Sequence, residues 1–157
     1  LSVLVENKFG VLARIAGLFS RRGFNIFSLA VAPTDDPSLS RISVVVDVHN
    51  TDAAQIAKQL DKLVNVLEIT ELKPDFSIER ELMLARIASN DSGAVQELVD
   101  SFGGSIVDSN QDQTIISVHA HPNQLDLCET ALREFGIVEL QRTGRIALGH
   151  LGDSQSN

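Results

Sequence analysis

The hydrophobic pattern changes its period at Gly10, and this change constrains the fold more than any other feature of the chain. Residues 1–5, LSVLV, alternate in the manner of a strand that is buried mainly on one face. Beyond Gly10 the apolar residues recur at helical spacing, and Gly23 marks the end of the predicted helix. The chain therefore begins with a strand that leads through a short turn into an amphipathic helix. The predicted apolar stripe of this helix consists of Val11, Leu12, Ile15, Ala16, Leu18 and Phe19.

The residues that follow complete a β-α-β-β-α-β order. Two runs rich in strand-forming residues, 25–32 and 40–48, flank the turn-forming sequence PTDDPS. Thr51 and Asp52 predict the start of a second helix, and residues 64–72 predict a last strand. This order is typical of two helices on one face of an antiparallel sheet, the ferredoxin-like plan.

The same order of elements recurs in the second half of the chain. Strands are predicted at 80–88, 105–108, 114–119 and 137–141, and helices at 93–102 and 123–135. Residues 1–75 carry 8 Lys/Arg and 9 Asp/Glu, whereas residues 76–157 carry 5 and 12, which indicates two units with different surfaces. We therefore predict an α+β fold of two ferredoxin-like βαββαβ modules. The predicted domains are 1–74 and 78–149, followed by a tail at 150–157.

Composition argues against several classes of function. With 43% hydrophobic residues the chain is typical of a globular protein. Seven Phe, no Trp, no Tyr and a net charge of −8 argue against nucleic-acid binding, which needs stacking rings and a basic face. The single cysteine, Cys128, rules out an internal disulfide and indicates a reducing, cytoplasmic compartment. We predict no membrane span, because no apolar run approaches about 20 residues. We also predict no signal peptide, because residues 1–5 are too short for its apolar region and lack a basic flank.

Each candidate for a catalytic or metal site has a structural explanation that is favoured over the functional one. His119 and His121 are spaced for metal binding at a strand end, but no Cys or third His accompanies them. Asp35 and Asp36 lie in an ordinary turn sequence, and Cys128 lies within a predicted helix, where it is a packing residue. The pair at 103–104, GG, lacks the Lys and Ser/Thr of a phosphate-binding loop. The sequence therefore predicts neither a catalytic nor a metal site.

The turn at residues 6–12, ENKFGVL, carries a more specific prediction. A helix start has unpaired backbone N–H groups and a partial positive charge, which attract a carboxylate, and Gly10 leaves that approach open. Asn7 and Asn25 offer amide oxygens to an ammonium group. This set fits a free aliphatic amino acid, but a tight turn at Asn7 and Gly10 and a plain strand start at Asn25 explain the same residues. Val11, Leu12 and Ile26 are the candidate apolar lining.

Five stretches of the chain together resemble one protein family. They are ENKFGVLAR at 6–14, FSRRGFNI at 19–26, VAPTDDPSLSR at 31–41, IERELMLARI at 78–87 and FGIVELQRTGRIAL at 135–148. The first three are similar to the ACT domain of the regulatory (small) subunit of acetohydroxyacid synthase, also called acetolactate synthase. Many ACT domains share the glycine, whereas the run through TDDP is far more specific. The resemblance covers nearly the whole chain.

The resemblance implies a regulatory subunit that has no chemistry or cofactor of its own. Members of this family bind a larger catalytic subunit, which uses thiamine diphosphate, Mg²⁺ and FAD to condense pyruvate with a second 2-ketoacid. They raise its activity and make it sensitive to feedback inhibition by valine in branched-chain amino acid biosynthesis. Their ACT domains pair as a homodimer, with the effector at the interface. Carried over by motif, the ligand groups are Asn7, Gly10, Val11 and Leu12 of one protomer with Asn25 and Ile26 of the other.

Departures from the family pattern and rival functions complete the reading of the sequence. Ala13 stands where some members carry Ser, and the stretch 88–96 is short beside the family pattern. A stand-alone ACT-domain sensor that regulates transcription or another enzyme would bind an amino acid but would not capture the thiamine-dependent subunit. A small acylphosphatase also binds at its first strand–helix turn, but it uses an Arg in a loop where this chain has ENKFG. The sequence leaves open whether valine alone is sensed, or leucine and isoleucine as well.

Overall fold

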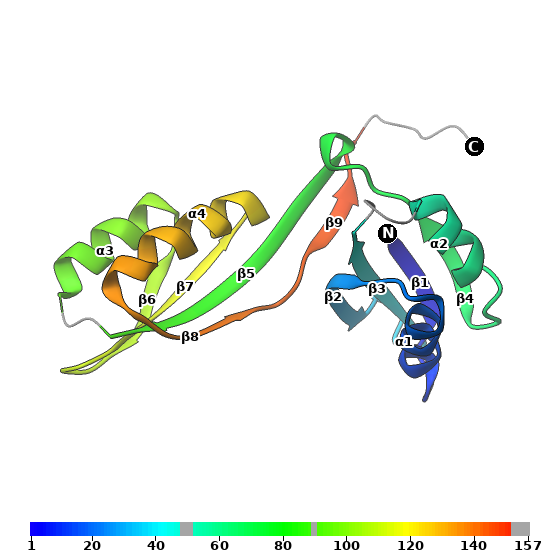
Figure 1. Cartoon of the computed structure of the whole chain (residues 1–157), viewed down its shortest axis with the longest axis horizontal. Coiled ribbons are helices and arrows are strands. Elements are labelled where there is room, and N and C mark those ends of the chain that lie inside the picture. Colours follow the sequence, from blue (N-terminus) through cyan, green and yellow to red (C-terminus); the bar gives the residue numbers. More distant parts are fainter. Residues whose placement is uncertain (48–51, 89–90, 152–157) are drawn as a thin grey trace. The chain divides into compact units, whose positions relative to one another are not determined.

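The computed structural model describes residues 1–47, 52–88 and 91–151 of the chain. They divide into two compact units, one formed by Leu1–Ile78 with the chain from Arg145 onward, the other by Glu79–Gly144. Each unit contains an antiparallel sheet covered by helices on one face (Figure 1). The predicted α+β fold of two ferredoxin-like modules is therefore confirmed. Within the described ranges, no helix is long and apolar enough to cross a membrane.

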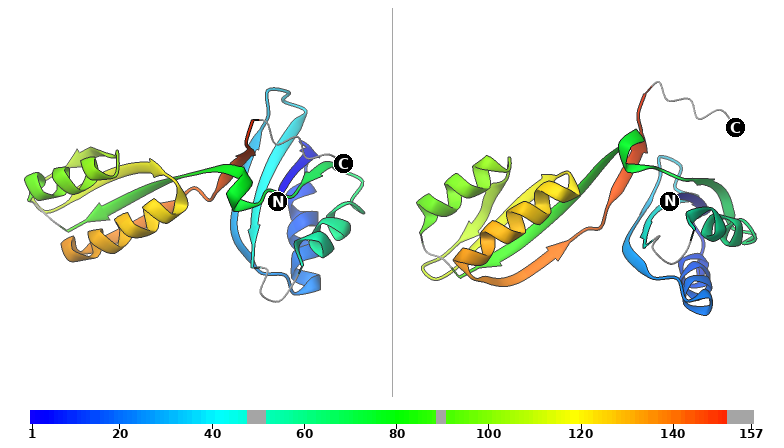
Figure 2. Two further views of the ribbon diagram at one scale, coloured as in Figure 1. Left: turned by 90° about the horizontal axis from the view of Figure 1, so that it is seen from above. Right: turned by 45° about the horizontal axis from the view of Figure 1, so that its top comes forward.

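The first unit follows the predicted order of elements. They are β1 (Ser2–Glu6), α1 (Val11–Arg22), β2 (Ile26–Pro33), β3 (Leu39–Val46), α2 (Ala53–Leu60) and β4 (Val66–Thr70). The strands lie in the order β2-β3-β1-β4, so β2 and β4 form the edges of this sheet. Both β1 and β2 run antiparallel to β3, and they are therefore parallel to each other. Figure 2 shows α1 and α2 on the same side of the sheet.

Two glycines with left-handed backbone conformations set the ends of α1. Gly10 precedes the helix with φ of +82° and Gly23 follows it with φ of +68°, where its N–H bonds back to the last turn. Leu12 and Ala16, which the sequence placed on the apolar stripe, are exposed, because the face that packs on the sheet is narrower than predicted. Burying each large side chain of this face contributes about 1.5–3 kcal/mol. The buried residues of α1 are Val11, Ile15, Leu18 and Phe19.

The second unit repeats the plan. Its elements are β5 (Ser77–Ile87), α3 (Ser92–Ser101), β6 (Ser105–Ser109), β7 (Thr114–Ala120), α4 (Pro122–Leu132), the 3₁₀ turn η2 (Arg133–Phe135) and β8 (Ile137–Arg142). The strand order is β6-β7-β5-β8. Alternate residues of β5 are buried under the helices, and its first two residues, Ser77 and Ile78, still belong to the first unit. The buried residues of β5 that face α3 and α4 are Met83, Ala85 and Ile87.

An ion-pair network joins β5, β8 and α4 in the second unit. The guanidinium group of Arg142 lies 2.7 Å from Asp126 and 3.7 Å from Glu129, both on α4. Its Nε atom lies 3.3 Å from Oε2 of Glu81, a carboxylate on β5 that is only 7% exposed. Glu81 is the one buried carboxylate of this network, so loss of Arg142 would leave its charge without a partner, which typically costs a few kcal/mol. The network is therefore structural, and it fixes β8 against the helix layer.

The chain after β8 differs from the prediction. Gly144, with φ of +86°, ends β8, and an additional strand, β9 (Ile146–Gly149), then pairs with β5. The sequence prediction assigned residues 145–149 to the second domain, whereas their contacts group them with the first unit. β9 has only four residues and pairs with a strand far away in the sequence, so its own hydrophobic pattern is too short to predict it.

Smaller differences concern the ends of elements. The helix predicted at 123–135 ends at Leu132 and continues as η2, and the strand predicted at 64–72 is limited to Val66–Thr70. Some predicted features lie outside the described residues: Val48, Thr51, residues 89–90 of the stretch 88–96, and residues 152–157 of the predicted tail.

Candidate functional site

The turn between β1 and α1 is held in place by a loop around Asn65. The N–H of Glu6 donates to the Asn65 carbonyl at 3.0 Å, and the Glu6 carboxylate accepts hydrogen bonds from Lys8 Nζ, at 2.8 Å, and from the Asn65 amide. These bonds, that of Lys8 first, lower the pKa of Glu6. Arg14 donates to the oxygen of the same Asn65 amide at 2.9 Å. The sequence analysis missed Asn65, since 59 residues separate it from Glu6 and no local pattern links them.

Asn7 is oriented by the turn that contains the TDDP motif. Its backbone N–H donates to the carbonyl of Ser38 at 2.7 Å, and its side-chain Nδ2 donates to the carbonyl of Pro37 at 2.9 Å. Because the amide nitrogen faces Pro37, the Oδ1 atom is turned away from it. The structure gives this Oδ1 no partner among the described residues. Asn7 is exposed, so its oxygen is available to an external donor.

Asp36 shapes the turn that holds Asn7. Its Oδ1 accepts hydrogen bonds from the Ser38 hydroxyl at 2.7 Å and from the Ser38 N–H at 2.8 Å. The same bonds, the hydroxyl first, lower the pKa of Asp36. The interpretation of this sequence as a turn is confirmed, and the turn also places two carbonyl oxygens against Asn7.

The start of α1 is open to an anion. Gly10 is the N-cap residue, no side chain caps the helix, and its first turn contains no acidic residue. The Val11 N–H makes a long bond of 3.3 Å to the Lys8 carbonyl, while the N–H groups of Leu12 and Ala13 have no partner among the described residues. These groups and the helix dipole provide a partial positive charge. A carboxylate that approaches them meets no side chain at Gly10.

Backbone geometry, and not a lack of space, explains glycine at position 10. A Cβ built there would meet nothing within 4 Å, so the space beside the helix start is empty. The φ of +82°, however, is a conformation that L-residues rarely adopt. The side chain of Val11 is 5% exposed and lies in the core, so Val11 offers the site only its backbone. Leu12 is 43% exposed, so it is the apolar side chain that the start of α1 offers to a ligand.

Asn25 and Ile26 lie at the opposite end of the sheet from Asn7. In β3, Leu39 pairs with Glu6 of β1, Ser40 pairs with the end of β2, and Val46 pairs with Ile26. The length of β3 between these ends is about 23 Å, at about 3.3 Å per residue. One chain therefore does not bring the two predicted halves of the site together. They can meet only when a second copy supplies one of them, which is how the resemblance assigned them.

The edge strand β2 carries a surface for such a second copy. Its eight residues, IFSLAVAP, contain no charge, and one side of its backbone faces no strand of the sheet. Phe27 is 67% exposed and Val31 is 44% exposed on this strand. An uncharged, apolar edge of this length is a template for pairing with another chain.

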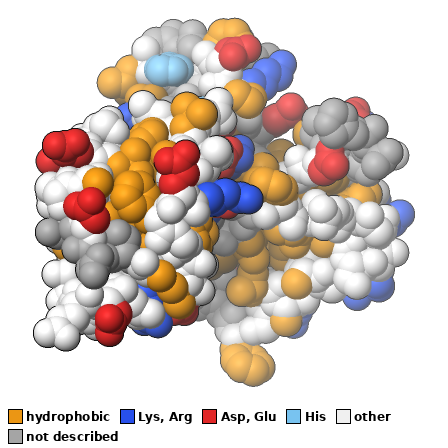
Figure 3. Space-filling model, turned by 60° about the vertical axis from the view of Figure 1, so that its left-hand side comes forward, with side chains coloured by type: hydrophobic (Ala, Val, Ile, Leu, Met, Phe, Trp, Pro, Cys, Tyr) orange, Lys and Arg blue, Asp and Glu red, His pale blue; other side chains and the backbone are white. Residues whose placement is uncertain are grey.

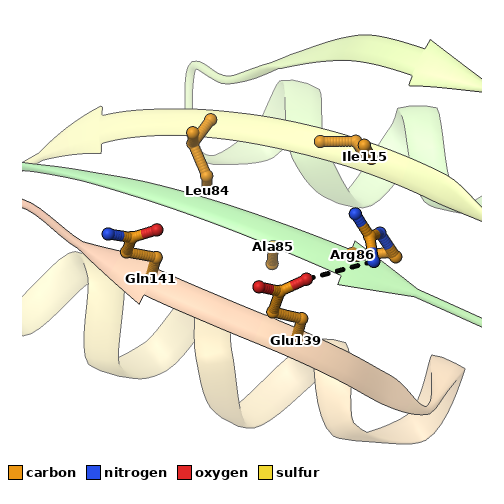
Figure 4. A pocket seen from close by; sticks show the side chains of 6 residues that line it. All are labelled: Leu84, Ala85, Arg86, Ile115, Glu139 and Gln141. Atoms are coloured by element: carbon orange, nitrogen blue, oxygen red, sulfur yellow. Dashed lines mark ion pairs between the residues drawn. The ribbon is translucent and has the colours of Figure 1, made fainter.

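The second unit carries a different kind of hollow. A pocket of about 190 Å³ lies on the sheet, where Arg86 and Glu139 form an ion pair of 3.1 Å (Figure 4). Their side chains are 43% and 63% exposed, so the pair contributes little energy. A second pocket of about 200 Å³ shares Arg86 and Ile115 with it. The residues that line the first pocket are Leu84, Ala85, Arg86, Ile115, Glu139 and Gln141.

The residues weighed as catalytic or metal-binding candidates have structural partners. His119 lies on β7, and His121, directly after that strand, caps α4 by accepting the Asn123 N–H on Nδ1 at 3.2 Å. Cys128 is fully buried, and burial raises its pKa to about 11. In the described part of the chain, no group of three or more His, Cys, Asp or Glu residues could hold a metal ion.

On the face drawn in Figure 3, Lys and Arg side chains are scattered rather than gathered.

Comparison with known proteins decides the family. Residues 1–68 match the family described as AHAS small subunit-like ACT domain, and residues 80–150 match the small subunit of acetolactate synthase. A probable acetolactate synthase small subunit of Archaeoglobus fulgidus is 43% identical, over 94% of each chain. The chain belongs to the acetolactate synthase small-subunit family.

Further members of the acetolactate synthase small-subunit family align over almost the same length. The acetolactate synthase isozyme 3 small subunit of Escherichia coli is 41% identical over 94% of this chain and 93% of its own. The crystal structure of the small subunit from Thermotoga maritima is 34% identical, covers 96% of both chains and superposes with a TM-score of 0.88. The expected resemblance is confirmed, and both halves of the candidate site lie within the ACT-domain match.

Proposed function

We propose that this chain is the regulatory subunit of an acetolactate synthase, which binds the catalytic subunit, raises its activity and makes it sensitive to valine. The observation that carries the proposal is the open start of α1 at Gly10 beside the free Oδ1 of Asn7, in a chain of this family. The N–H groups of the helix start would bind the valine carboxylate, and Asn7 would accept from its ammonium group. Thiamine diphosphate, Mg²⁺ and FAD would be held by the catalytic subunit, and the assembly would work in the cytoplasm.

A homodimer would complete the effector site. Asn25 and Ile26 of a second copy would supply the part that lies at the other end of the sheet in one chain. The uncharged edge of β2 supports this pairing, since two such edges can join their sheets side by side. Leu12 of one protomer and Ile26 of the other would then enclose the aliphatic side chain.

The energy available at such a site is sufficient. Valine has about eight non-hydrogen atoms, for which the ligand-efficiency ceiling is roughly −12 kcal/mol. A micromolar dissociation constant needs about −8 kcal/mol. Inhibition further requires that valine binds one arrangement of the regulatory dimer better than another, and that the catalytic subunit distinguishes the two. A ligand that bridges two protomers meets the first requirement directly.

The variant Gly10→Asp tests this proposal. Its carboxylate would occupy and repel the place of the ligand carboxylate, so valine should no longer inhibit the reconstituted enzyme, while activation is retained. Calorimetric titration of the regulatory subunit should show saturable valine binding in the wild type and none in the variant. Gly10→Asn is the matched control, because asparagine has the size of aspartate and also tolerates the left-handed conformation, but carries no charge.

Two results would contradict the proposal. Normal valine inhibition of Gly10→Asp would remove the helix start from the site. Failure of the tagged wild-type chain to co-purify the catalytic subunit would favour a stand-alone amino-acid sensor instead.

A further inference from the structure

A segment from the far end of the sequence holds the beginning of β2. The N–H of Arg145 donates to Oγ of Ser28 at 2.9 Å, across 117 residues of sequence. The guanidinium carbon of Arg145 lies 5.3 Å from the centre of the Phe27 ring. Arg145, Phe27 and Ser28 all belong to the first unit. The two partners on β2 directly follow Asn25 and Ile26, which form half of the candidate effector site.

The same segment is anchored at its other end. β9 pairs with β5, and the N–H of His150 donates to the carbonyl of Phe76 at 3.1 Å. Residues Arg145–His150, here called the C-terminal strap, are therefore fixed at both ends. One end rests on β2, and the other rests on the short 3₁₀ helix η1 (Pro74–Phe76) that precedes β5.

The strap contacts β2 where that strand is irregular. The register between β2 and β3 shifts between Ile26 and Ser28, so Phe27 is an extra residue without a direct partner on β3. A bulge of this kind bends the strand and redirects the side chains next to it. The Arg145 guanidinium lies against the bulged residue, and the Arg145 N–H binds the residue that follows. Both contacts come from outside the ladder of the sheet.

We propose that the C-terminal strap fixes the bulge of β2 and thereby positions Asn25 and Ile26 for the effector. Arg145 is then a positioning residue for valine binding that does not itself touch the ligand. The inference rests on the proposed function. Gly144 is the last residue of the second unit, and the strap follows it directly in the chain. The strap therefore links the second unit covalently to the segment that contacts β2 beside Asn25 and Ile26.

The experiment compares full-length variants by amide hydrogen exchange and by calorimetric titration with valine. In Arg145→Ala, exchange of residues 25–29 should become faster, and valine should bind about two- to fivefold more weakly, the range of a partly exposed cation–π contact. Arg145→Lys keeps the cation and should recover part of both effects. Arg133→Ala is the matched control, since that arginine pairs with Glu129 on α4 in the second unit and should change neither quantity.

A double variant identifies the contact through which Arg145 acts. If the guanidinium works through Phe27, Arg145→Ala combined with Phe27→Leu should bind valine no more weakly than the weaker single variant. Unchanged exchange at 25–29 together with unchanged valine affinity in Arg145→Ala would overturn the inference. So would a loss that Arg145→Lys does not restore in any part. If the wild type itself binds no valine, the proposed function fails, and the exchange comparison alone then decides whether the strap fixes the bulge.

Discussion

Asn7 takes its position from a turn that lies 30 residues away in the sequence. Consecutive carbonyl oxygens of that turn, from Pro37 and Ser38, accept its side-chain and backbone N–H groups. Asp36 closes the turn through two hydrogen bonds from Ser38. The turn that contains TDDP therefore has a physical role at the residue scale. It turns the amide of Asn7 so that the oxygen, and not the nitrogen, faces outward.

Asp36→Ala should therefore weaken valine binding, although Asp36 is not one of the proposed ligand residues. Loss of its two hydrogen bonds loosens the turn, and we expect the affinity to fall by roughly two- to tenfold, the effect of one or two hydrogen bonds. Asp36→Asn keeps an acceptor oxygen and should lose less. Calorimetric titration measures both variants. Equal wild-type affinity in Asp36→Ala would show that Asn7 is oriented without the turn.

The pH dependence of this turn follows from the lowered pKa of Asp36. A carboxyl group with a pKa depressed in the folded state stabilises the fold above its ordinary pKa of 3.8, and this contribution is lost as the pH falls through the folded value. The wild type should therefore lose stability more steeply than Asp36→Asn in acid below about pH 4. Thermal unfolding of the two proteins at pH 3 and pH 7 gives the comparison.

At the scale of elements, three features of the first unit meet on β2. It forms the edge, it begins at half of the candidate effector site, and it carries the bulge that the strap contacts. Pairing of two β2 edges would bring these features to the dimer interface. Any change along this strand should therefore alter dimerisation and valine binding together.

Val31→Lys should separate the protomers. Two lysines would face each other across the paired edges, and we expect the dissociation constant of the dimer to rise at least about tenfold. Valine binding should weaken in parallel, because the half-sites no longer meet. Sedimentation velocity measures the dimer, and Val64→Lys is the control, since Val64 is a 91% exposed loop residue away from β2. A stable dimer in Val31→Lys would place the interface elsewhere.

The elements that could be predicted from the sequence are those with signals inside their own residues. Gly10 and Gly23 set the ends of α1, and Asp52 caps α2 by accepting the Ala54 N–H, so both helices begin where the sequence indicated. Contacts that join distant residues had no such signal. The bond of Glu6 to Asn65, the contact of Arg145 with Phe27 and the strand β9 depend on the folded chain. The backbone of the candidate site was therefore predictable from the sequence, whereas the distant residues that support it were not.

At the scale of the whole molecule, an effector that bridges two copies must also strengthen their association. A ligand that binds only the dimer stabilises it by about 2.7 kcal/mol per site at a concentration 100 times its dissociation constant. Two identical sites follow from a twofold interface. Ligand binding and assembly are then one coupled equilibrium.

Valine should therefore lower the dissociation constant of the dimer by about 100-fold per site under that condition. Sedimentation velocity at protein concentrations near the dissociation constant measures the shift. Two controls are the wild type with D-valine and the Gly10→Asp variant with L-valine. In neither control should the dissociation constant of the dimer change. A dissociation constant that does not respond to saturating L-valine would mean that the ligand binds within one protomer.

The first unit is built from both ends of the described chain, with the second unit inserted between residues 78 and 145. A ribosome makes the chain from its N-terminus, so the sheet β2-β3-β1-β4 can form while the second unit is still being synthesised. The contacts of Arg145 with Phe27 and Ser28 cannot form until the second unit has left the exit tunnel. A chain interrupted before that point would carry the open helix start of α1 without the strap. The strap can therefore reach β2 only after the second unit has been synthesised.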